Sequence, residues 1–134
     1  MVIDQDLLYN LPVAVYCCDA DGHIEFYNKA ATNLWGAEPV PGKDRWCGPV
    51  KMYALDGTPI KPGSSPMATA LRENRIIYSV MCIERHDGDR RYVVPNPQLR
   101  YNPDGTLSGA VNTLIDITAQ IEEQKKQPKT LNNL

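Results

Sequence analysis

The sequence predicts an α+β domain built on a five-stranded antiparallel sheet, with its helices gathered on one face. Four Asp-Gly pairs divide the chain, and three of them lie between runs of strand-forming residues. Asp-Gly in that setting is a strong hairpin signal. Two segments with helix-capping residues lie between the first hairpin and the later strands. Strands and helices are therefore segregated along the chain, which is typical of the α+β class.

Size and composition favour one globular domain. The chain has 134 residues, of which 43% are apolar and 22% charged. Its formal net charge of −2 argues against a nucleic-acid-binding face, which is normally basic. No apolar run approaches the ~20 residues of a membrane span, and acids stand where a secretory signal carries bases. We therefore expect a cytoplasmic domain without a membrane span or a nucleic-acid partner.

Residues 1–11 are expected to form a short amphipathic helix. Aliphatic residues repeat there with helical spacing, and Pro12 ends the pattern. Three of them are candidates for covering the open face of the sheet or for contacting a second subunit: Leu7, Leu8 and Leu11.

The first hairpin and two helices follow in order. "VAVYCCD" and "HIEFYN" flank Asp21-Gly22 as paired strands. "NKAATNLWG" begins with the capping residue Asn28 and stops at a glycine, and "SPMATALREN" begins with Ser65 followed by proline. Between these helices, residues 38–63 are rich in Pro and Gly and are expected to be mostly irregular, with Asp56-Gly57 as a loop turn.

Three further strands form a meander, and the first strand of the sheet is expected to lie beside the last. Asp87-Gly88 separates "IIYSVMCIER" from "RRYVV", and Asp104-Gly105 separates "PQLRY" from "LSGAVNTLIDI". Counting from two-residue turns places Pro97 opposite Tyr78 and Asn112. Proline has no N–H to donate, so Pro95 and Pro97 predict a bulge that breaks pairing on one side only. The charged residues around the third turn are expected to be a solvated tip: Glu84, Arg85, Arg90 and Arg91.

The last segment, residues 119–134, is expected to hold a helix and a loose tail. Thr118 can cap the helix, and Pro128 should end it after about three turns. The acids lie near its start and the lysines near its end, which suits the helix dipole.

Three motifs, in order and at domain spacing, resemble the PAS domain: "LPVAVYCCDADGHIEFYNKAATNLWG", "DGTPIKPGSSPMATAL" and "GAVNTLIDITAQ". The resemblance is to PAS domains of bacterial sensor kinases and related regulators, and it makes residues 12–118 the PAS domain. It implies the strand order 2-1-5-4-3, helices over one face and often a small-molecule pocket between them. It also implies that Asp116 and Thr118 form the junction where the sheet passes into a signalling helix.

Nothing in the sequence indicates an enzyme. His23 and His86 each adjoin an Asp-Gly turn and are expected to face solvent. No nucleophile has a recognisable partner, and glycine-rich phosphate loops are absent. The four cysteines lack metal-ligand spacing and are expected to be reduced thiols that pack as small hydrophobes.

No cofactor is predicted. Haem-binding relatives hold iron through a histidine of the helical face, and neither predicted helix between the hairpin and the meander contains one. An unusual haem ligand, Cys47 or Met67, is the alternative. Flavin-binding relatives place a reactive cysteine in a helical motif, and "DRWCGP" puts Cys47 in that region without the surrounding polar residues. An unidentified small molecule remains an open alternative to an empty domain.

The candidate pocket residues share large side chains, several with polar tips, at helical or inward strand positions: Tyr16, Trp35, Trp46, Met52, Met67, Tyr78 and Asn112. The alternative is that most of them are core. Asn112 differs because an amide inside an apolar strand needs hydrogen-bond partners if it is buried. Those partners could come from a ligand, from water or from unpaired backbone.

The expected function is that of a sensory domain in bacterial signal transduction. It would bind a small molecule or partner and pass a conformational change through the helix after Thr118. A homodimer is expected, with a downstream kinase or regulator domain as a further partner. Two alternatives stay open: a ligand-free module for dimerisation or docking, and a small enzyme on a related scaffold.

Overall fold

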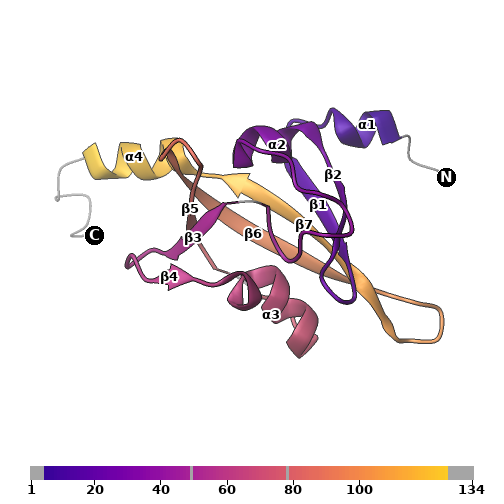
Figure 1. The fold of residues 1–134 in the computed structure, drawn as a ribbon. Coiled ribbons are helices and arrows are strands. Elements are labelled where there is room, and N and C mark those ends of the chain that lie inside the picture. The colour runs from indigo at the N-terminus through magenta and orange to yellow at the C-terminus, as the bar shows by residue number, and fades with distance from the viewer. Residues whose placement is uncertain (1–4, 49, 78, 127–134) are drawn as a thin grey trace.

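The computed structural model describes residues 5–48, 50–77 and 79–126. It has a single sheet of seven strands, all paired antiparallel, in the order β2-β1-β7-β6-β5-β3-β4 (Figure 1). The strands are β1 (Ala14–Asp19), β2 (Ile24–Tyr27), β3 (Lys51–Ala54), β4 (Pro59–Ile60), β5 (Met81–Glu84), β6 (Arg90–Tyr101) and β7 (Leu107–Asp116). The helices are α1 (Gln5–Tyr9), α2 (Lys29–Trp35), α3 (Pro66–Glu73) and α4 (Thr118–Lys126), with a 3-10 turn at Pro62–Ser64.

The predicted α+β class and the central strand order are confirmed, but the predicted number of strands is wrong. The order 2-1-5-4-3 corresponds to β2-β1-β7-β6-β5, and the first strand does lie beside the last. The additional strands are β3 and β4, which continue the sheet beyond β5. Within the described part of the chain, none of the helices could span a membrane.

The extra strands come from the segment expected to be irregular. Asp56-Gly57 closes a hairpin between β3 and β4, in which Tyr53 pairs with Pro59. β3 then pairs with β5 from Lys51 opposite Glu84 onwards. That pairing is between segments far apart in the sequence, so local strand signals were a poor guide to it.

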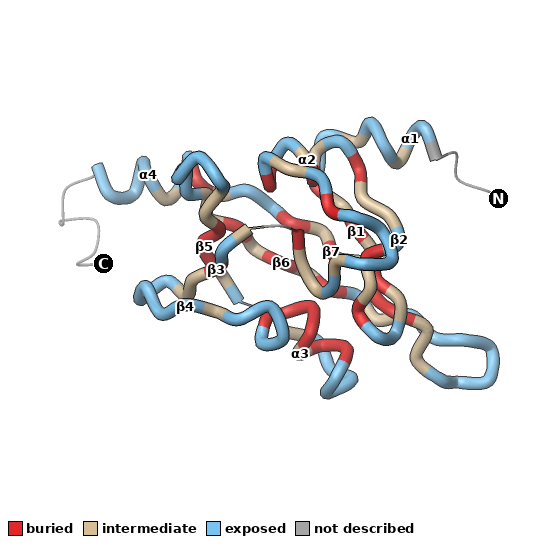
Figure 2. Tube along the Cα trace, viewed as in Figure 1, coloured by how far each residue is buried: buried red, intermediate tan, exposed pale blue. Residues whose placement is uncertain are grey.

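The α2 and α3 helices begin and end where the capping residues predict. The Asn28 side chain accepts the Ala31 N–H, and Gly36 ends α2 in the left-handed conformation. The Ser65 side chain caps α3 in the same manner. α2 packs on β1, and α3 packs on β6 and β7. Figure 2 shows buried residues on both helices and along the middle strands, while the hairpin tips are exposed.

All four Asp-Gly pairs form the same three-residue loop, which is one residue longer than the two-residue turns assumed at Asp87-Gly88 and Asp104-Gly105. In the hairpin between β6 and β7, the Asn102 N–H donates to the Thr106 carbonyl, and the Gly105 N–H donates back to Asn102. Gly105 has φ +88°, a value that glycine adopts without steric cost. This pattern corresponds to a type I turn followed by a glycine in the left-handed region.

The predicted bulge at residues 95–97 is wrong. β6 pairs continuously with β7 from Val93 to Arg100, and the register shifts only between Arg100 and Tyr101. That shift offsets the longer loop, so Pro97 does lie opposite Asn112, as the two-residue count predicted. Tyr78, predicted to lie opposite Pro97 on the other side, is outside the described residues.

β6 tolerates the two prolines because of the side to which their backbone groups point. Tyr92 donates its N–H to Thr118 Oγ1 and accepts the Ile117 N–H, so both of its backbone groups face the β7 side. Backbone direction alternates along a strand, and Pro95 and Pro97 therefore face the β5 side. The described pairing with β5 ends at Val93, opposite Met81. The two prolines therefore lack N–H groups only on a side of β6 where no described strand pairs with them.

Candidate functional site

A chain of buried hydrogen bonds crosses the centre of the sheet. Asn112 Nδ2 donates to the Tyr16 hydroxyl at 3.1 Å, and that hydroxyl donates to the Trp46 carbonyl at 2.7 Å. The Asn112 Oδ1 accepts the Asn96 N–H at 2.9 Å. Asn112 and Tyr16 are 1% and 2% exposed, so these bonds replace water for both side chains. The predicted need of Asn112 for partners is met by the protein itself.

The register explains why these side chains meet. Tyr16 pairs with Asn112 across β1 and β7, and Asn112 pairs with Pro97 across β7 and β6. Directly paired residues project on the same face of a sheet, so all three lie side by side on the buried face. Burial raises the pKa of the Tyr16 hydroxyl well above its ordinary value, with the nearby Cys18 and Cys47 thiols acting in the same direction. Tyr16 therefore stays a neutral donor.

Aromatic side chains close the space around this network. Trp35 packs edge-on against Tyr16, with ring centroids 5.1 Å apart. Gly48 lies against the Trp35 ring so closely that a Cβ there would come within 2.1 Å of it. Trp46 is half-buried and has φ +72°, an uncommon value for a residue with a side chain. Met52 and Met67 are buried in the same core.

The structure thus places six of the seven candidate pocket residues, and Tyr78 lies outside the described part. Four of the six are in the hydrophobic core, Asn112 is a buried polar residue, and Trp46 packs against the core. None of the six lines the cleft between α2 and the end of β7 that is characterised below. A ligand-binding role for them stays a prediction.

The sheet meets α4 at a compact polar junction. The Asp116 Oδ1 accepts the Thr118 N–H at 2.9 Å and the Thr118 hydroxyl at 2.5 Å. The same hydroxyl oxygen accepts the Tyr92 N–H from β6 at 2.9 Å. The first residue of α4 is therefore tied to the end of β7 and to the start of β6. The capping acceptor of this helix is the Asp116 carboxylate, rather than the Thr118 side chain as predicted.

The second Asp116 oxygen binds an arginine of β6. Arg91 donates to Oδ2 from Nε at 3.1 Å and from Nη2 at 2.8 Å. Partial burial is the largest influence on the pKa of Asp116 and raises it, but the hydrogen bonds from Thr118 and Arg91 together outweigh it. The pKa of Asp116 is therefore lowered, and the carboxylate is ionised at neutral pH.

A second contact ties α4 to β6 near the end of the helix. Lys125 Nζ donates to the Tyr92 hydroxyl at 3.1 Å and lies 5.0 Å from the centre of its ring. The partners are exposed, so this contact contributes little by itself. Tyr92 therefore contacts both ends of α4: its backbone N–H bonds to Thr118 at the start of the helix, and its ring and hydroxyl contact Lys125 near the end.

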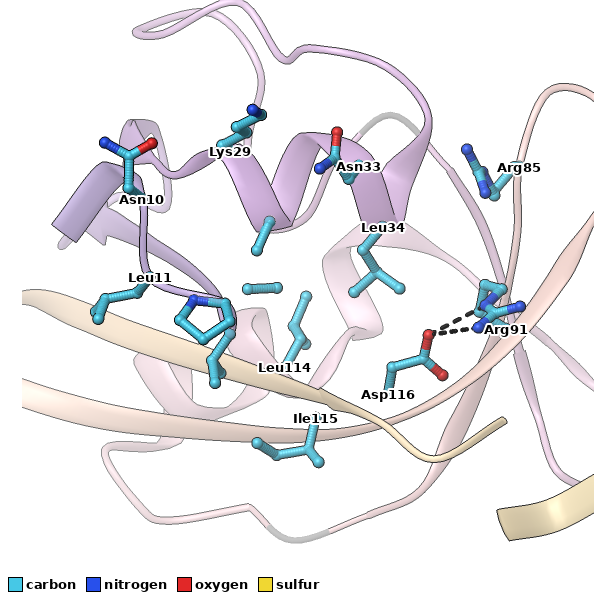
Figure 3. Close-up of a pocket in the computed structure, with 14 residues that line it drawn as sticks. Asn10, Leu11, Lys29, Asn33, Leu34, Arg85, Arg91, Leu114, Ile115 and Asp116 are labelled. Carbon is cyan, nitrogen blue, oxygen red and sulfur yellow. Dashed lines mark hydrogen bonds and ion pairs between the residues drawn. The ribbon is translucent and has the colours of Figure 1, made fainter. Parts of the chain in front are cut away.

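A cleft of about 730 Å³ lies beside this junction, between α2 and the end of β7. Figure 3 shows Leu34 and Leu114 pointing into it, with Asp116 and Arg91 at one end and Arg85 above them. The cleft is lined by apolar residues (Leu11, Pro12, Val13, Ala14, Ala30, Leu34, Leu114 and Ile115) and polar ones (Asn10, Lys29, Asn33, Arg85, Arg91 and Asp116).

The connection that follows α1 lines part of this cleft, from Asn10 to Val13. The Leu7 side chain is exposed, while Leu8 and Leu11 are half-buried. Asn28 holds the connection in place, since its Nδ2 donates to the carbonyls of Val13 at 2.7 Å and Leu8 at 3.2 Å. Contacts of these leucines with a second subunit stay a prediction.

Neither histidine forms a catalytic arrangement within the described structure. His86 is exposed, as expected, whereas His23 is half-buried and lies 3.3 Å from Asp19. Asp19, Asp21 and His23 approach closely enough to share an ion, but Asp19 Oδ1 already accepts the N–H groups of both other residues. All four cysteines are free thiols.

The arginines at this site were missed from the sequence. Arg85 and Arg91 were expected in a solvated hairpin tip, but both line the cleft and are only partly exposed. Arg91 lies on the same face of β6 as Val93, the partner of Asp116. Asp116 itself could have indicated Arg91, because its carboxylate requires a cationic donor from the neighbouring strand.

Comparisons with known proteins support the fold. A family profile described as "PAS fold" matches residues 8–122. A comparison with curated protein sequences finds no significant match. The solved structure of an RNA-binding light-oxygen-voltage receptor superposes with a TM-score of 0.71 at 18% identity, over 97% of this chain and 36% of that one. The chain thus spans about a third of that receptor's length.

Two isolated domains also superpose. One is the PAS domain of BvgS from Bordetella pertussis, with a TM-score of 0.58 and 20% identity over 97% of this chain and 92% of that one. The other is the PAS domain of an HTR-like protein from Haloarcula marismortui, with a TM-score of 0.61 and 19% identity over 84% and 88%. The profile match covers most of the chain, and the chain belongs to the PAS-fold family, whose members are sensory and signalling modules.

Proposed function

We propose that this PAS domain is a sensory module of bacterial signal transduction whose output is the position of α4. The observation that carries the proposal is the junction at Asp116. The Asp116 carboxylate accepts hydrogen bonds from the backbone and hydroxyl of Thr118, the first residue of α4, and it also binds Arg91 of β6. A change in the packing of β6 or β7 therefore acts on the first turn of α4 directly.

The coupling free energy of such a switch is small, and the contacts of Asp116 are strong enough to supply it. Coupling between an input site and an output element is typically about 1–3 kcal/mol. An exposed ion pair contributes about 0–1 kcal/mol, and each net hydrogen bond about 0.5–1.5 kcal/mol. Loss or repositioning of the bonds to Asp116 therefore suffices to shift a two-state α4 several-fold.

Similar structures support the assignment to signalling. One is the light-oxygen-voltage domain of a blue-light activated histidine kinase from Erythrobacter litoralis, and another is the light-state dimer of the fungal photoreceptor Vivid. These descriptions belong to those proteins. They favour a homodimer and a downstream kinase or regulator domain for this chain. A cytoplasmic location and the absence of enzymatic activity stay predictions.

The absence of a bound flavin or haem stays a prediction for this chain. In the structure, the space between the sheet and the helices holds Tyr16, Trp35 and Met67, each at most 2% exposed. Burial raises the pKa of the Cys47 thiol to about 12. A visible absorption spectrum of the purified protein tests both cofactors, because flavin and haem each absorb visible light.

A ligand-free docking module is the second candidate, and one surface favours it. The outer face of the sheet carries neighbouring apolar residues, with Val94 paired to Ile115 and Cys17 paired to Val111. Ile115 is 44% exposed. Apolar patches of this kind mark interaction surfaces.

Native mass spectrometry of protein purified from its source separates the two candidates. A retained small molecule supports sensing. A dimer that carries no small molecule supports the docking module and counts against a ligand-driven sensor.

A further inference from the structure

We infer that the cleft between α2 and the end of β7 binds a small organic anion. The charged group of the anion would be held by Arg85 and Arg91, and its apolar body would lie against Leu34 and Leu114. This inference deepens the proposed function, and it rests on that function only where it links binding to α4.

The cleft is positively charged although the chain is not. Three cationic side chains line it, those of Lys29, Arg85 and Arg91, against the single carboxylate of Asp116. The whole chain carries a formal net charge of −2. Figure 3 shows the amine of Lys29 pointing away from Leu34 and Leu114, so Arg85 and Arg91 are the cations nearest to Asp116 in this cleft.

Within the described structure, Arg85 is the cation of this cleft that has a buried donor without a partner. Its Nε is buried and has no hydrogen-bond partner among the described atoms. Its Nη1 lies 3.4 Å from Asp89 Oδ2, at the long end of the range for a charged hydrogen bond. A buried donor without a partner destabilises the folded state. The buried Nε lies against Gly36, so an anion in the cleft would bind the other nitrogens of this guanidinium.

Arg91 has a free edge even while it binds Asp116. Its Nε and Nη2 both donate to Asp116 Oδ2, which leaves Nη1 uncommitted in the described structure. A guanidinium can serve two anions on different edges because its donors are fixed in one plane. Binding at the free edge would therefore add to the Asp116 contact rather than replace it.

The rest of the lining selects for a ligand with an apolar body. Leu11, Leu34 and Leu114 come from three different segments of the chain and line the cleft, with Leu34 and Leu114 facing each other from α2 and β7 (Figure 3). The volume of about 730 Å³ lies within the usual range for small-molecule sites. An inorganic ion would leave this apolar surface wet, whereas a short-chain carboxylate or phosphate ester would cover it.

The link to signalling follows from the position of Arg91. An anion on its free edge would fix the guanidinium against Asp116, and Asp116 in turn starts α4. Binding is then expected to slow hydrogen exchange in the first turn of α4. This step, unlike binding itself, requires the proposed function.

The experiment is an NMR titration of the full chain with three probes of equal chain length: hexanoate, hexyl phosphate and hexanol. Saturable shifts of the Leu34 and Leu114 methyl resonances with an anionic probe, and an affinity at least about tenfold weaker for hexanol, are expected. Comparison of hexanoate with hexyl phosphate identifies which anionic group the cleft prefers. Equal affinity for hexanol, or no saturable shift with either anion, would overturn the inference.

Two variants assign the binding to Arg85. Arg85→Gln should weaken the anion by about tenfold or more. Asp89→Asn removes the other contact of Arg85 and one nearby negative charge, so it should leave binding unchanged or tighten it. An Arg85→Gln protein that retains its native spectrum and binds hexanoate as the parent does would contradict the assignment.

The same titration, read by hydrogen exchange, separates this inference from the proposed function. Saturable binding without any change in the exchange of α4 supports the site and counts against the relay. Absence of binding, together with an altered α4 in Asp116→Ala, supports the relay and rejects the site.

Discussion

Arg91 and Asp116 join β6 to the end of β7 through one carboxylate oxygen, which lies 3.1 Å from Nε and 2.8 Å from Nη2. The other oxygen of the same carboxylate accepts hydrogen bonds from the N–H and the hydroxyl of Thr118, the first residue of α4. One oxygen of Asp116 therefore binds the sheet, and the other binds the helix. The side chains of Arg91 and Asp116 are 34% and 32% exposed, so their ion pair contributes little to the free energy of unfolding. Its main effect is to fix the positions of the two side chains.

Replacement of Arg91 by glutamine should raise the pKa of Asp116 towards its ordinary value of 3.8. In the parent, the lowered pKa stabilises the fold above about pH 3.8, and this contribution is lost as the pH falls through the lower folded-state value. In Arg91→Gln this contribution is smaller, and its loss is complete at a higher pH because the folded-state pKa lies closer to 3.8. At pH 7 the free energy of unfolding should change by less than about 1 kcal/mol.

Carboxyl-detected NMR titration measures this shift directly. Asp104 is the internal control, because its pKa is also lowered but by hydrogen bonds from Thr106 and without an arginine. An Asp116 pKa that does not move in Arg91→Gln would show that the ion pair does not act on the carboxylate.

Removal of the Tyr16 hydroxyl should destabilise the domain by about 1–3 kcal/mol, because Asn112 loses the acceptor of its buried amide and the Trp46 carbonyl loses its donor. Urea unfolding of Tyr16→Phe measures the loss. Tyr101→Phe is the matched control. Its hydroxyl bonds to Asn74 at 2.6 Å on the surface, and its loss should cost less than about 1 kcal/mol. Equal losses in the two variants would argue against the buried network as an organising element.

Alanine at Gly109 should destabilise the pairing of β1 with β7 strongly. Gly109 has φ +151°, and a Cβ there would lie 2.0 Å from the Cys18 carbonyl oxygen. Gly57→Ala is the control, since Gly57 also has positive φ but a Cβ added to it would meet no atom within 4 Å. The control should cost about 1–2 kcal/mol from backbone conformation alone. Urea unfolding that gives Gly109→Ala no greater loss would contradict the close approach of the strands.

Alkylation of Cys18 and Cys47 should be slow in the native protein. Burial raises the pKa of each thiol to about 12, and nearby thiols and carboxylates act in the same direction. At pH 8 only roughly one thiol in 10⁴ is then ionised, and the thiolate is the reactive form. Iodoacetamide labelling read by mass spectrometry should accelerate by orders of magnitude in urea. Native Cys47 that reacts as fast as the unfolded residue would identify an activated thiol instead.

Local sequence signals predicted most of the sheet because its hairpins close on themselves. The loops at Asp87-Gly88 and Asp104-Gly105 bring neighbouring strands together through contacts a few residues apart. The β3–β4 hairpin was missed although it contains the same Asp-Gly loop. Its short strands have weak propensities, and their place in the sheet depends on pairing with β5.

The candidate site was less predictable because it depends on contacts between distant segments. Asn112 stood out in the sequence, and its partners proved to be protein groups. The bulge predicted at Pro95 and Pro97 failed because it assumed that β5 continues alongside them. Arg91 lies on the face of β6 that turns towards Asp116, and that direction requires the register between the strands.

Hydrogen exchange of α4 in Asp116→Ala tests the central claim most directly. Asp104→Ala is a matched control, because Asp104 accepts the N–H and hydroxyl of Thr106 much as Asp116 accepts those of Thr118, but in a hairpin away from α4. The expected result is that Asp116→Ala loses protection throughout α4 while the sheet keeps its own, and that Asp104→Ala leaves α4 unchanged. Identical α4 exchange in Asp116→Ala and the parent would contradict the account.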